Sequence, residues 1–478
     1  MRGASMICAG LAAGCTTQHA ARPPPAQAPA VLAEVPASAP PTPAPALGSW
    51  RSAWTRACVA TTSRVRPCEL SAAAADDAGN VYVGGGSYMA FELAGEKHPA
   101  RGFEQMVLAS FDANGAPRWS HAFGSQWHNL VHDVRVIGDR LFVVGTHANG
   151  FDAGGVRLPN IPPPKVPGQD TGFESETGFV AAYDLDGKAL WAKNLSRLLD
   201  DSNRPGVHAG GSMFGCSIHA DGGNGAWLTI RDAQTHVVHV TADGAARESY
   251  VVDLTTPGIL LGRVTSVDAK GELFRLWKSK DGTPRLRRCA ANSPCRDTAL
   301  PLMPASYPQW GALRVLDSGG VVAVVTGDQI IAGGYRFEIQ VVALDAAGRV
   351  TLSRPLMEPG FATQQTQVLG VSTTSDGGWL LAVRHATPLM VDGAVVPAAA
   401  EGTTSLFELS ADARRTLRVW QLDGAACPGF QAKTLSFFPS TPGHLLAVGD
   451  APTRSAALLC GDSRVMGGVV TSLSLVGL

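Results

Sequence analysis

Two short groups of residues have the types and spacing that could bind a metal. His128 and His132 have the spacing of a zinc-binding helix, but the glutamate that would follow the first histidine is missing and the segment leads into a strand pattern. Asp184 and Asp186 stand in a turn without the further acidic positions and closing glutamate of a calcium loop. We therefore interpret both groups as structural and predict no metal ligand.

Other chemical motifs are missing from the sequence. It contains no G-x-S-x-G nucleophile turn, no phosphate-cradling Gly-Lys-Ser/Thr and no dinucleotide fingerprint, and Gly84 to Gly86 are interpreted as the end of a strand. We therefore predict no catalytic residue and no cofactor. Catalytic residues drawn from several repeats would escape such a search, so an enzyme remains an alternative.

The composition is that of a folded, weakly charged chain. Of 478 residues, 45% are hydrophobic and 17% charged, so the chain is too apolar to be disordered as a whole. Lys and Arg number 39 against 40 Asp and Glu, a net charge of -1, so we expect no nucleic-acid partner. No apolar run approaches the roughly 18 residues that span a bilayer, which predicts a soluble body.

The N-terminus has the features of an export signal. Arg2 precedes a small apolar stretch, and LAAGC at 11–15 resembles a bacterial lipobox, which implies that Cys15 is lipidated. Residues 16–48 are rich in Pro and Ala, which predicts a disordered, semi-rigid linker. We expect a signal segment at 1–15, this linker at 16–48 and a folded domain at 49–478. The alternative is an ordinary, unprocessed N-terminus.

The remaining cysteines suggest an oxidising compartment. None lies in a C-x-x-C pair, which disfavours structural zinc, whereas two pairs are close enough in sequence for short-loop disulfides. The predicted pairs are Cys58 with Cys68, Cys289 with Cys295 and, less locally, Cys427 with Cys460, which leaves Cys216 over. Scattered buried thiols in a reduced protein are the alternative.

A degenerate hairpin recurs along the chain from about residue 71. Asp or Asn beside Gly supplies the positive φ of a tight turn, and the run that follows is β-branched or aromatic. About seven copies stand at 74–85, 134–145, 219–230, 265–277, 314–327, 372–383 and 437–449. A second hairpin, with an Asp-x-x-Gly turn and often a Trp, follows at 107–124, 179–195, 339–356 and 407–422, and more weakly at 236–252.

Four antiparallel strands per unit predict an all-β fold, a single β-propeller of about seven four-stranded blades. The main rival is a pair of β-sandwich domains. Trp50 and Trp54 stand in a segment that resembles a fourth strand and would complete the last blade beside 469–475. The sequence does not decide which of the two is outermost.

The units resemble the repeat of bacterial secreted β-propeller proteins, D-x-x-G-N-V-Y-V-x-G followed by a small outer motif and then D-x-x-G-x-x-x-W. Residues 76–84 carry the first part, and 112–119 and 184–191 carry the last. The outer motif stands at 91–99, 151–159, 330–337 and 390–397. A looser resemblance, over 109–119, is to quinone-dehydrogenase-type propeller repeats, which outer-membrane assembly lipoproteins share without binding quinone. The first resemblance implies a fold and an exported location, not a reaction.

The order of strands places the tight turns on one face of the predicted disc and the longer links on the other. Loops on a rigid scaffold are common binding sites, so the link face is the candidate surface. Its candidate binding residues are Tyr88, His98, Lys165, Asp170, Asp200, Asp201, Arg204 and His208. The two aspartates could also contribute to a cation site, although a solvated acidic pair explains them better.

Two functions remain open. The first is a non-catalytic envelope protein, a monomer anchored by its lipid at the outer membrane or cell surface, or else secreted, whose link face binds a protein or a glycan. The second is a propeller enzyme, a lyase, hydrolase or quinoprotein, with a site at the axis. His, Arg and carboxylates converging at the axial mouth would favour the enzyme, and an apolar or glycine-lined mouth would favour binding.

Overall fold

The structure is a computed structural model that describes residues 46–60, 68–93, 95–124, 129–148, 150–159, 177–201, 216–231, 235–252, 259–279, 283–301, 307–316, 318–331, 334–357, 366–373, 378–398, 403–421, 431–437, 444–450, 458–460, 463–465 and 468–476. The chain divides into two units, Met1–Pro43 and Ala44–Leu478. The predicted signal segment, Cys15 and most of the predicted linker lie outside the described residues.

Five four-stranded antiparallel sheets follow one another along the second unit. The first holds β3 (Glu69–Ala75), β4 (Val81–Ser87), β7 (Gln105–Phe111) and β8 (Pro117–Phe123). The second holds β9 (Asn129–Ile137), β10 (Arg140–His147), β13 (Thr177–Asp184) and β14 (Ala189–Asn194). The third holds β15 (Cys216–Ala220), β16 (Ala226–Arg231), β17 (Thr235–Val240) and β18 (Ala246–Val252).

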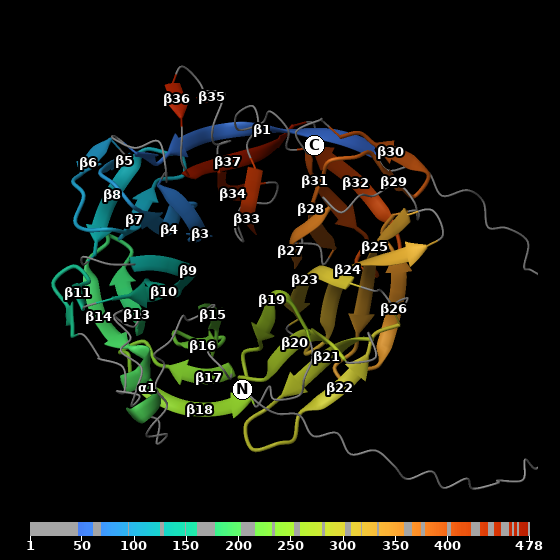
Figure 1. The fold of residues 1–478 in the computed structure, drawn as a ribbon, viewed down its shortest axis with the longest axis horizontal. Coiled ribbons are helices and arrows are strands. Elements are labelled where there is room, and N and C mark those ends of the chain that lie inside the picture. Colours follow the sequence, from blue (N-terminus) through green and yellow to red (C-terminus); the bar gives the residue numbers. More distant parts are fainter. Residues whose placement is uncertain are drawn as a thin grey trace, which may run out of the picture. The chain divides into compact units, whose positions relative to one another are not determined.

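The fourth sheet holds β19 (Ile259–Val267), β20 (Leu273–Lys278), β21 (Pro284–Cys289) and β22 (Arg296–Ala299). The fifth holds β23 (Tyr307–Val315), β24 (Val321–Ile331), β25 (Gly334–Leu344) and β26 (Val350–Pro355). Figure 1 shows the sheets arranged around a ring, with the first strand of each innermost, and β3 lies against β9 while β19 lies against β23. The fold is a β-propeller.

The sixth sheet has eight strands, so the described residues form six sheets of four or more strands where the repeat predicted about seven blades. It runs from β27 (Gln367–Thr373), β28 (Trp379–His385), β31 (Thr403–Leu409) and β32 (Thr416–Gln421) through β1 (Ala46–Ala57) and β37 (Gly468–Val476) to β34 (His444–Asp450) and β33 (Gln431–Phe437). The number differs because β1 pairs in parallel with β32 and antiparallel with β37, which merges the last two repeats into one sheet.

Short pairs and one helix decorate the sheets. They are β2 (Val59–Ala60) with β5 (Phe91–Leu93) and β6 (Glu96–His98), β11 (Phe151–Asp152) with β12 (Arg157–Leu158), β29 (Leu389–Val391) with β30 (Ala394–Val396), β35 (Leu458–Cys460) with β36 (Ser463–Val465), and α1 (Leu195–Asp201). Within the ranges that the structure describes, no helix is long and apolar enough to cross a membrane.

The Asp-x-x-Gly turns form as their chemistry predicts. Asp112 Oδ1 accepts hydrogen bonds from the backbone N–H of Asn114 and Ala116 at 2.9 and 2.7 Å, which closes the β7–β8 turn. Asp184 does the same for Asp186 and Lys188 at 3.1 and 2.8 Å. Both carboxylates therefore hold backbone amides, which explains the Asp-x-Asp sequence at 184–186 as a turn.

Neighbouring sheets interlock through a tryptophan that sits over such a turn. The indole N–H bonds are Trp119 to Leu185 O at 3.1 Å, Trp191 to Ala242 O at 2.7 Å and Trp227 to Ala269 O at 3.2 Å. Gly187 and Gly271 have φ of +87° and +82°, and a Cβ on them would lie 2.7 and 2.4 Å from ring atoms of Trp119 and Trp227. Only glycine meets both demands.

Apolar side chains fill the spaces between sheets. One such layer joins Tyr82, Val134, Phe179 and Tyr183, all fully or almost fully buried, from the first two sheets. Disulfides link Cys58 with Cys68 and Cys289 with Cys295, with Cα atoms 5.6 and 4.4 Å apart. Cys216 is buried among Ile218 and Leu228. Cys427 lies outside the described residues, so its pairing with Cys460 stays a prediction.

Candidate functional site

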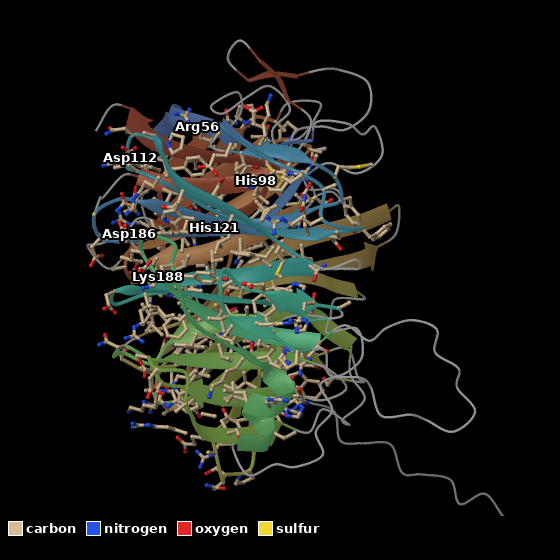
Figure 2. The ribbon with its side chains drawn as sticks, turned by 90° about the vertical axis from the view of Figure 1, so that its left-hand side faces the viewer. Arg56, His98, Asp112, His121, Asp186 and Lys188 are labelled. Carbon is tan, nitrogen blue, oxygen red and sulfur yellow. A yellow bond between two sulfur atoms is a disulfide. The ribbon has the colours of Figure 1, made fainter. Side chains whose placement is uncertain are left out.

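The outer edge of the first sheet carries a chain of polar side chains from two elements. Glu96 and His98 stand on β6, and Ser120 and His121 on β8, which β6 contacts. Ser120 Oγ donates to Glu96 Oε2 at 2.8 Å, and His98 Nε2 lies 2.7 Å from Ser120 Oγ. Figure 2 shows His98 and His121 on this edge. Ser, His and Glu are the residue types of a hydrolytic triad.

The geometry is not that of a triad. A triad serine donates a hydrogen bond to one ring nitrogen of the histidine, and the carboxylate accepts a hydrogen bond from the N–H of the other ring nitrogen. Here Ser120 donates to Glu96 instead, and that carboxylate lies 3.9 Å from His98 Nε2, the nitrogen that already contacts the serine. Burial lowers the pKa of His98 in spite of the nearby Glu96 charge. The three side chains therefore fasten the β5–β6 hairpin to β8.

The polar side chains on the turn side of the same edge also make structural contacts. Arg118 Nη2 donates to Asp186 Oδ1 at 2.9 Å and His121 Nε2 lies 3.0 Å from Gly187 O, both across to the second sheet. Arg56 Nε donates to Gly115 O at 2.7 Å from the ring-closing strand β1. Figure 2 shows Arg56, Asp112, Asp186 and Lys188 toward this side. These polar groups bind one sheet to the next.

The link between β4 and β7 presents an aromatic pair. Phe103 is 50% exposed, and its ring meets Tyr88 edge to face with centroids 5.4 Å apart. Both ends of the link are held, because Gln105 Nε2 donates to Met89 O at 2.8 Å and Asn129 Nδ2 of β9 donates to Glu104 O at 2.7 Å. An exposed phenylalanine thus stands on a fixed piece of backbone.

The structure describes half of the eight predicted binding residues, and only two in full. Tyr88 belongs to the aromatic pair, and His98 to the hairpin contact, so one of them lies at a candidate surface and the other is structural. Asp200 and Asp201 end α1, where the backbone alone is described. The other four fall outside the described residues: Lys165, Asp170, Arg204 and His208.

A second group of residues stands at the inner edge of the ring. Each of its members lies at the same register position of an innermost strand, where it pairs with the second or third residue of the next strand in the sheet. The innermost strands are β3, β9, β15, β19, β23, β27 and β33. The occupants are Ala74 opposite Tyr82, Arg135 opposite Phe142, His219 opposite Trp227, Ser266 opposite Phe274, Arg314 opposite Val322, Ser372 opposite Leu380 and Ser436 opposite Leu446. Among the described innermost strands, this register position is therefore occupied by one alanine, two arginines, a histidine and three serines.

One carboxylate lies just above this level. Asp133 Oδ1 and Oδ2 accept the backbone N–H of Val134 and Ile218 at 3.0 and 2.9 Å, so the carboxylate joins β9 to β15. Arg135 Nε lies 3.8 Å from Asp133 Oδ2, and its side chain is 52% exposed. Burial raises the pKa of Asp133 although Arg135 and the two amides favour its charged form.

His219 is neutral at physiological pH. Burial and then the positive charges of Arg135 and Arg314 lower the pKa of His219 to about 3. Ser217 Oγ lies 2.9 Å from its Nε2. The histidine of this axial group is therefore a poor proton acceptor.

Sequence reasoning missed this group because each member lies in a different repeat. The only local signal is the placement of charged residues at alternate positions of an innermost strand, as in Asp133 and Arg135. Aligning the hairpins on their turns would have placed Arg135, His219 and Arg314 at one level.

No protein-family model and no curated protein sequence matches this chain. Solved structures do resemble it. A protein of unknown function from Dyadobacter fermentans is 10% identical with a TM-score of 0.38, over 90% of this chain and 100% of that one. A luciferin-regenerating enzyme is 11% identical (TM-score 0.35, 88% and 97% covered), and BamB from Moraxella catarrhalis is 12% identical (0.32, 72% and 83%). Such scores say nothing of this chain's activity, and the propeller assignment stands on its own strand pairing.

Proposed function

We propose that the protein is a non-catalytic binding module of the cell envelope that holds a protein partner on the link segment 88–104. The observation that carries this proposal is the exposed Phe103, braced by Tyr88 on a link fastened at both ends. A large apolar side chain that stays exposed on a fixed loop loses little entropy when a partner covers it. Aromatic residues are also enriched at the centres of protein interfaces.

A protein partner fits this surface better than a glycan. Phe103 has no polar atom on its ring, and exposed Lys97 and Arg101 on the same segment supply a charged rim. An apolar centre with a polar rim is the usual anatomy of a protein interface, whereas a sugar site needs several hydrogen-bonding groups that converge beside the aromatic face.

Photo-crosslinking in cells that produce the full chain tests the proposal. A photoreactive benzoylphenylalanine replaces Phe103, and in the matched control it replaces Val395, which is 54% exposed on β30 of another sheet. We expect one discrete protein adduct at position 103 and none at 395. In co-purification, the Phe103→Ala chain should recover about one tenth of that partner or less, the usual loss for an interface anchor.

Three outcomes would contradict it: no adduct at 103, the same adducts at 103 and 395, or an adduct that protease leaves intact and a glycosidase removes. The last would replace the protein partner by a glycan.

The proposal includes export and a lipid anchor at Cys15. It is supported by the lipobox-like residues 11–15 and by the two disulfides, which persist in oxidising compartments. Growth with a labelled fatty acid should label the protein, and Cys15→Ser should abolish the label while Cys8→Ser keeps it. Label that survives Cys15→Ser would exclude this anchor.

The enzyme alternative has one observation in its favour, which is that Arg135, His219, Arg314 and Asp133 do gather near the axis. Acid and base catalysis needs a group that exchanges protons near the working pH. His219 is neutral and Asp133 is bound to two amides, so the group suits charge recognition better than proton transfer.

A further inference from the structure

The two disulfides found in the described part of the chain differ in exposure. Cys58 and Cys68 are both fully buried, so neither is in contact with solvent. In the second disulfide Cys289 is buried at 2% exposure, whereas Cys295 belongs to a run of exposed residues at 292–297. Thiol–disulfide exchange begins when a thiolate attacks a sulfur that it can reach. Of these two bonds, the second is therefore the one open to attack.

The exposed disulfide closes one end of the β21–β22 ladder, and this position decides which sulfur is attacked. Arg288 and Arg296 form the last pair of the ladder, and the two cysteines follow it with their Cα atoms 4.4 Å apart. Cys289 packs in the apolar cluster that contains Trp227. An incoming thiolate can therefore bond to Cys295, and Cys289 is the leaving group.

We propose that the disulfide of Cys289 and Cys295 is a thiol–disulfide exchange site, which takes a small, negatively charged thiol onto Cys295 in the folded protein. The thiolate bonds to Cys295 Sγ and the bond between the two cysteines breaks. Cys289 Sγ leaves and takes up the proton that the incoming thiol gave up. One disulfide replaces another, so the step consumes no oxidant and no reductant. This site is separate from the link segment 88–104, and it goes beyond the proposed function.

The outer strand β22 stays in place after the exchange because other contacts hold it. Arg287 Nε and Nη2 donate to Asp297 Oδ1 and Oδ2 at 2.8 and 2.9 Å, a bidentate pair between β21 and β22. Just beyond the other end of β22, Leu300 N donates to Pro284 O at 2.9 Å. The thiol left at Cys289 therefore stays beside the mixed disulfide, where it can attack that bond and restore the original one.

The charge beside the turn selects the thiol. Arg296 follows Cys295 directly in the chain, is exposed, and forms no ion pair with any residue that the structure describes. The next carboxylate along the chain, that of Asp297, is bound to Arg287. A cation near the attacked sulfur attracts an anionic thiol and stabilises its thiolate. We therefore expect a thiol that carries carboxylates to react faster than a thiol that carries an amine.

Incubation of the full, folded chain with glutathione tests the site. Excess N-ethylmaleimide stops the reaction by blocking free thiols, and peptide mass spectrometry locates each group. We expect glutathione on Cys295 and maleimide on Cys289. The disulfide of Cys58 and Cys68 should open at least about a hundredfold more slowly, because the structure around it must open before a thiol can reach it. Circular dichroism should show that the modified chain is folded.

Two surface variants test the role of charge. The probes are glutathione and cysteamine, whose amine is positive, compared at equal thiolate concentrations and low ionic strength. Glutathione should react faster with the natural chain, and Arg296→Gln should lower the ratio of the two rates about threefold. Arg157→Gln removes an exposed arginine of the outer strand β12 and should leave this ratio unchanged.

The proposal is overturned if no glutathione adduct forms at Cys295 in the folded chain, if the adduct forms at Cys289 instead, or if both disulfides open at the same rate. The same ratio of rates in the natural chain and in Arg296→Gln would exclude selection of an anionic thiol. The crosslinked adduct at Phe103 depends on none of these results, so failure of this site and failure of the proposed function are distinguishable.

Discussion

The polar side chains at the outer edge of the ring differ in their contacts from those at the inner edge. At the outer edge, Trp119 and Arg118 each bond to the turn of the next sheet, so their polar groups hold the ring together. At the inner edge, burial and then the positive charges of Arg135 and Arg314 lower the pKa of His219. The polar contacts of the outer edge stabilise the ring, whereas the inner edge places positive charges near a buried histidine. Arrangements that lower stability in this way are often found at functional sites.

The largest expected effect is at the outer edge, where Gly187→Ala should lower the free energy of unfolding by about 3 kcal/mol. An alanine at φ of +87° is strained by about 1 kcal/mol, and its Cβ would meet the Trp119 ring at 2.7 Å, which adds about 2 kcal/mol. Urea denaturation measures the loss. The control is Gly393→Ala, at φ of +79° with no atom within 4 Å of the new Cβ, which should lose only about 1 kcal/mol. Equal losses would show that the tryptophan contact does not constrain the turn.

The second effect concerns acid. His98, His147 and His219 all have pKa values below the ordinary 6.5, so between that value and their folded-state pKa the unfolded chain binds more protons than the folded one. Stability must therefore fall as pH is lowered through this window. From pH 7 to pH 5, His219 alone should account for about 2 kcal/mol.

Denaturation midpoints across this pH range measure the effect. His219→Gln should flatten the dependence, and the difference between the two chains isolates this residue from the carboxylates. An unchanged slope would mean that His219 is protonated as readily in the ring as in water.

A smaller effect tests the inner charges directly. Arg314→Gln removes a positive neighbour and should raise the pKa of His219 by on the order of half a unit, which NMR titration of the imidazole protons resolves. Arg157→Gln, on the outer strand β12, should leave that pKa where it was. If the pKa of His219 falls or is unchanged in the Arg314→Gln chain, the charge of Arg314 does not act on His219, and the prediction is wrong.

The smallest effect is expected at the link segment. Phe103→Ala should change the free energy of unfolding by no more than about 0.5 kcal/mol, because a half-exposed loop side chain contributes little to the core. Thermal melting of the purified chain checks this. A melting temperature lowered by several degrees would show that Phe103 stabilises the fold. The loss of a partner in Phe103→Ala could then not be assigned to the interface.

Much of the fold follows from local sequence, because each turn carries its own chemistry. Asp112 and Asp184 close their turns with their own side chains, and the strands beside them are apolar runs that prefer an extended backbone. The number of sheets does not follow in this way. It depends on the parallel pairing of Ser49 with Gln421, a contact between residues that no local pattern relates.

The candidate sites follow from sequence much less well. Tyr88 was predicted from its place in a long link, but the exposure of Phe103 beside it depends on how that link is pinned by Gln105 and Asn129. The axial group needs the register of four strands at once, and His219 taken alone looks like any strand histidine. Long-range register is what a single sequence does not display.

The closing strand β1 has a consequence for how the protein matures. Its partner β37 is synthesised more than four hundred residues later. The last sheet can therefore be completed only after residue 476 has left the ribosome and any export channel. Until then β1 can pair only with β32, through residues 46–49, and the rest of the strand has no partner in the sheet. We expect the ring to lock last at this seam, and a pull on the tether to load the seam before any other sheet.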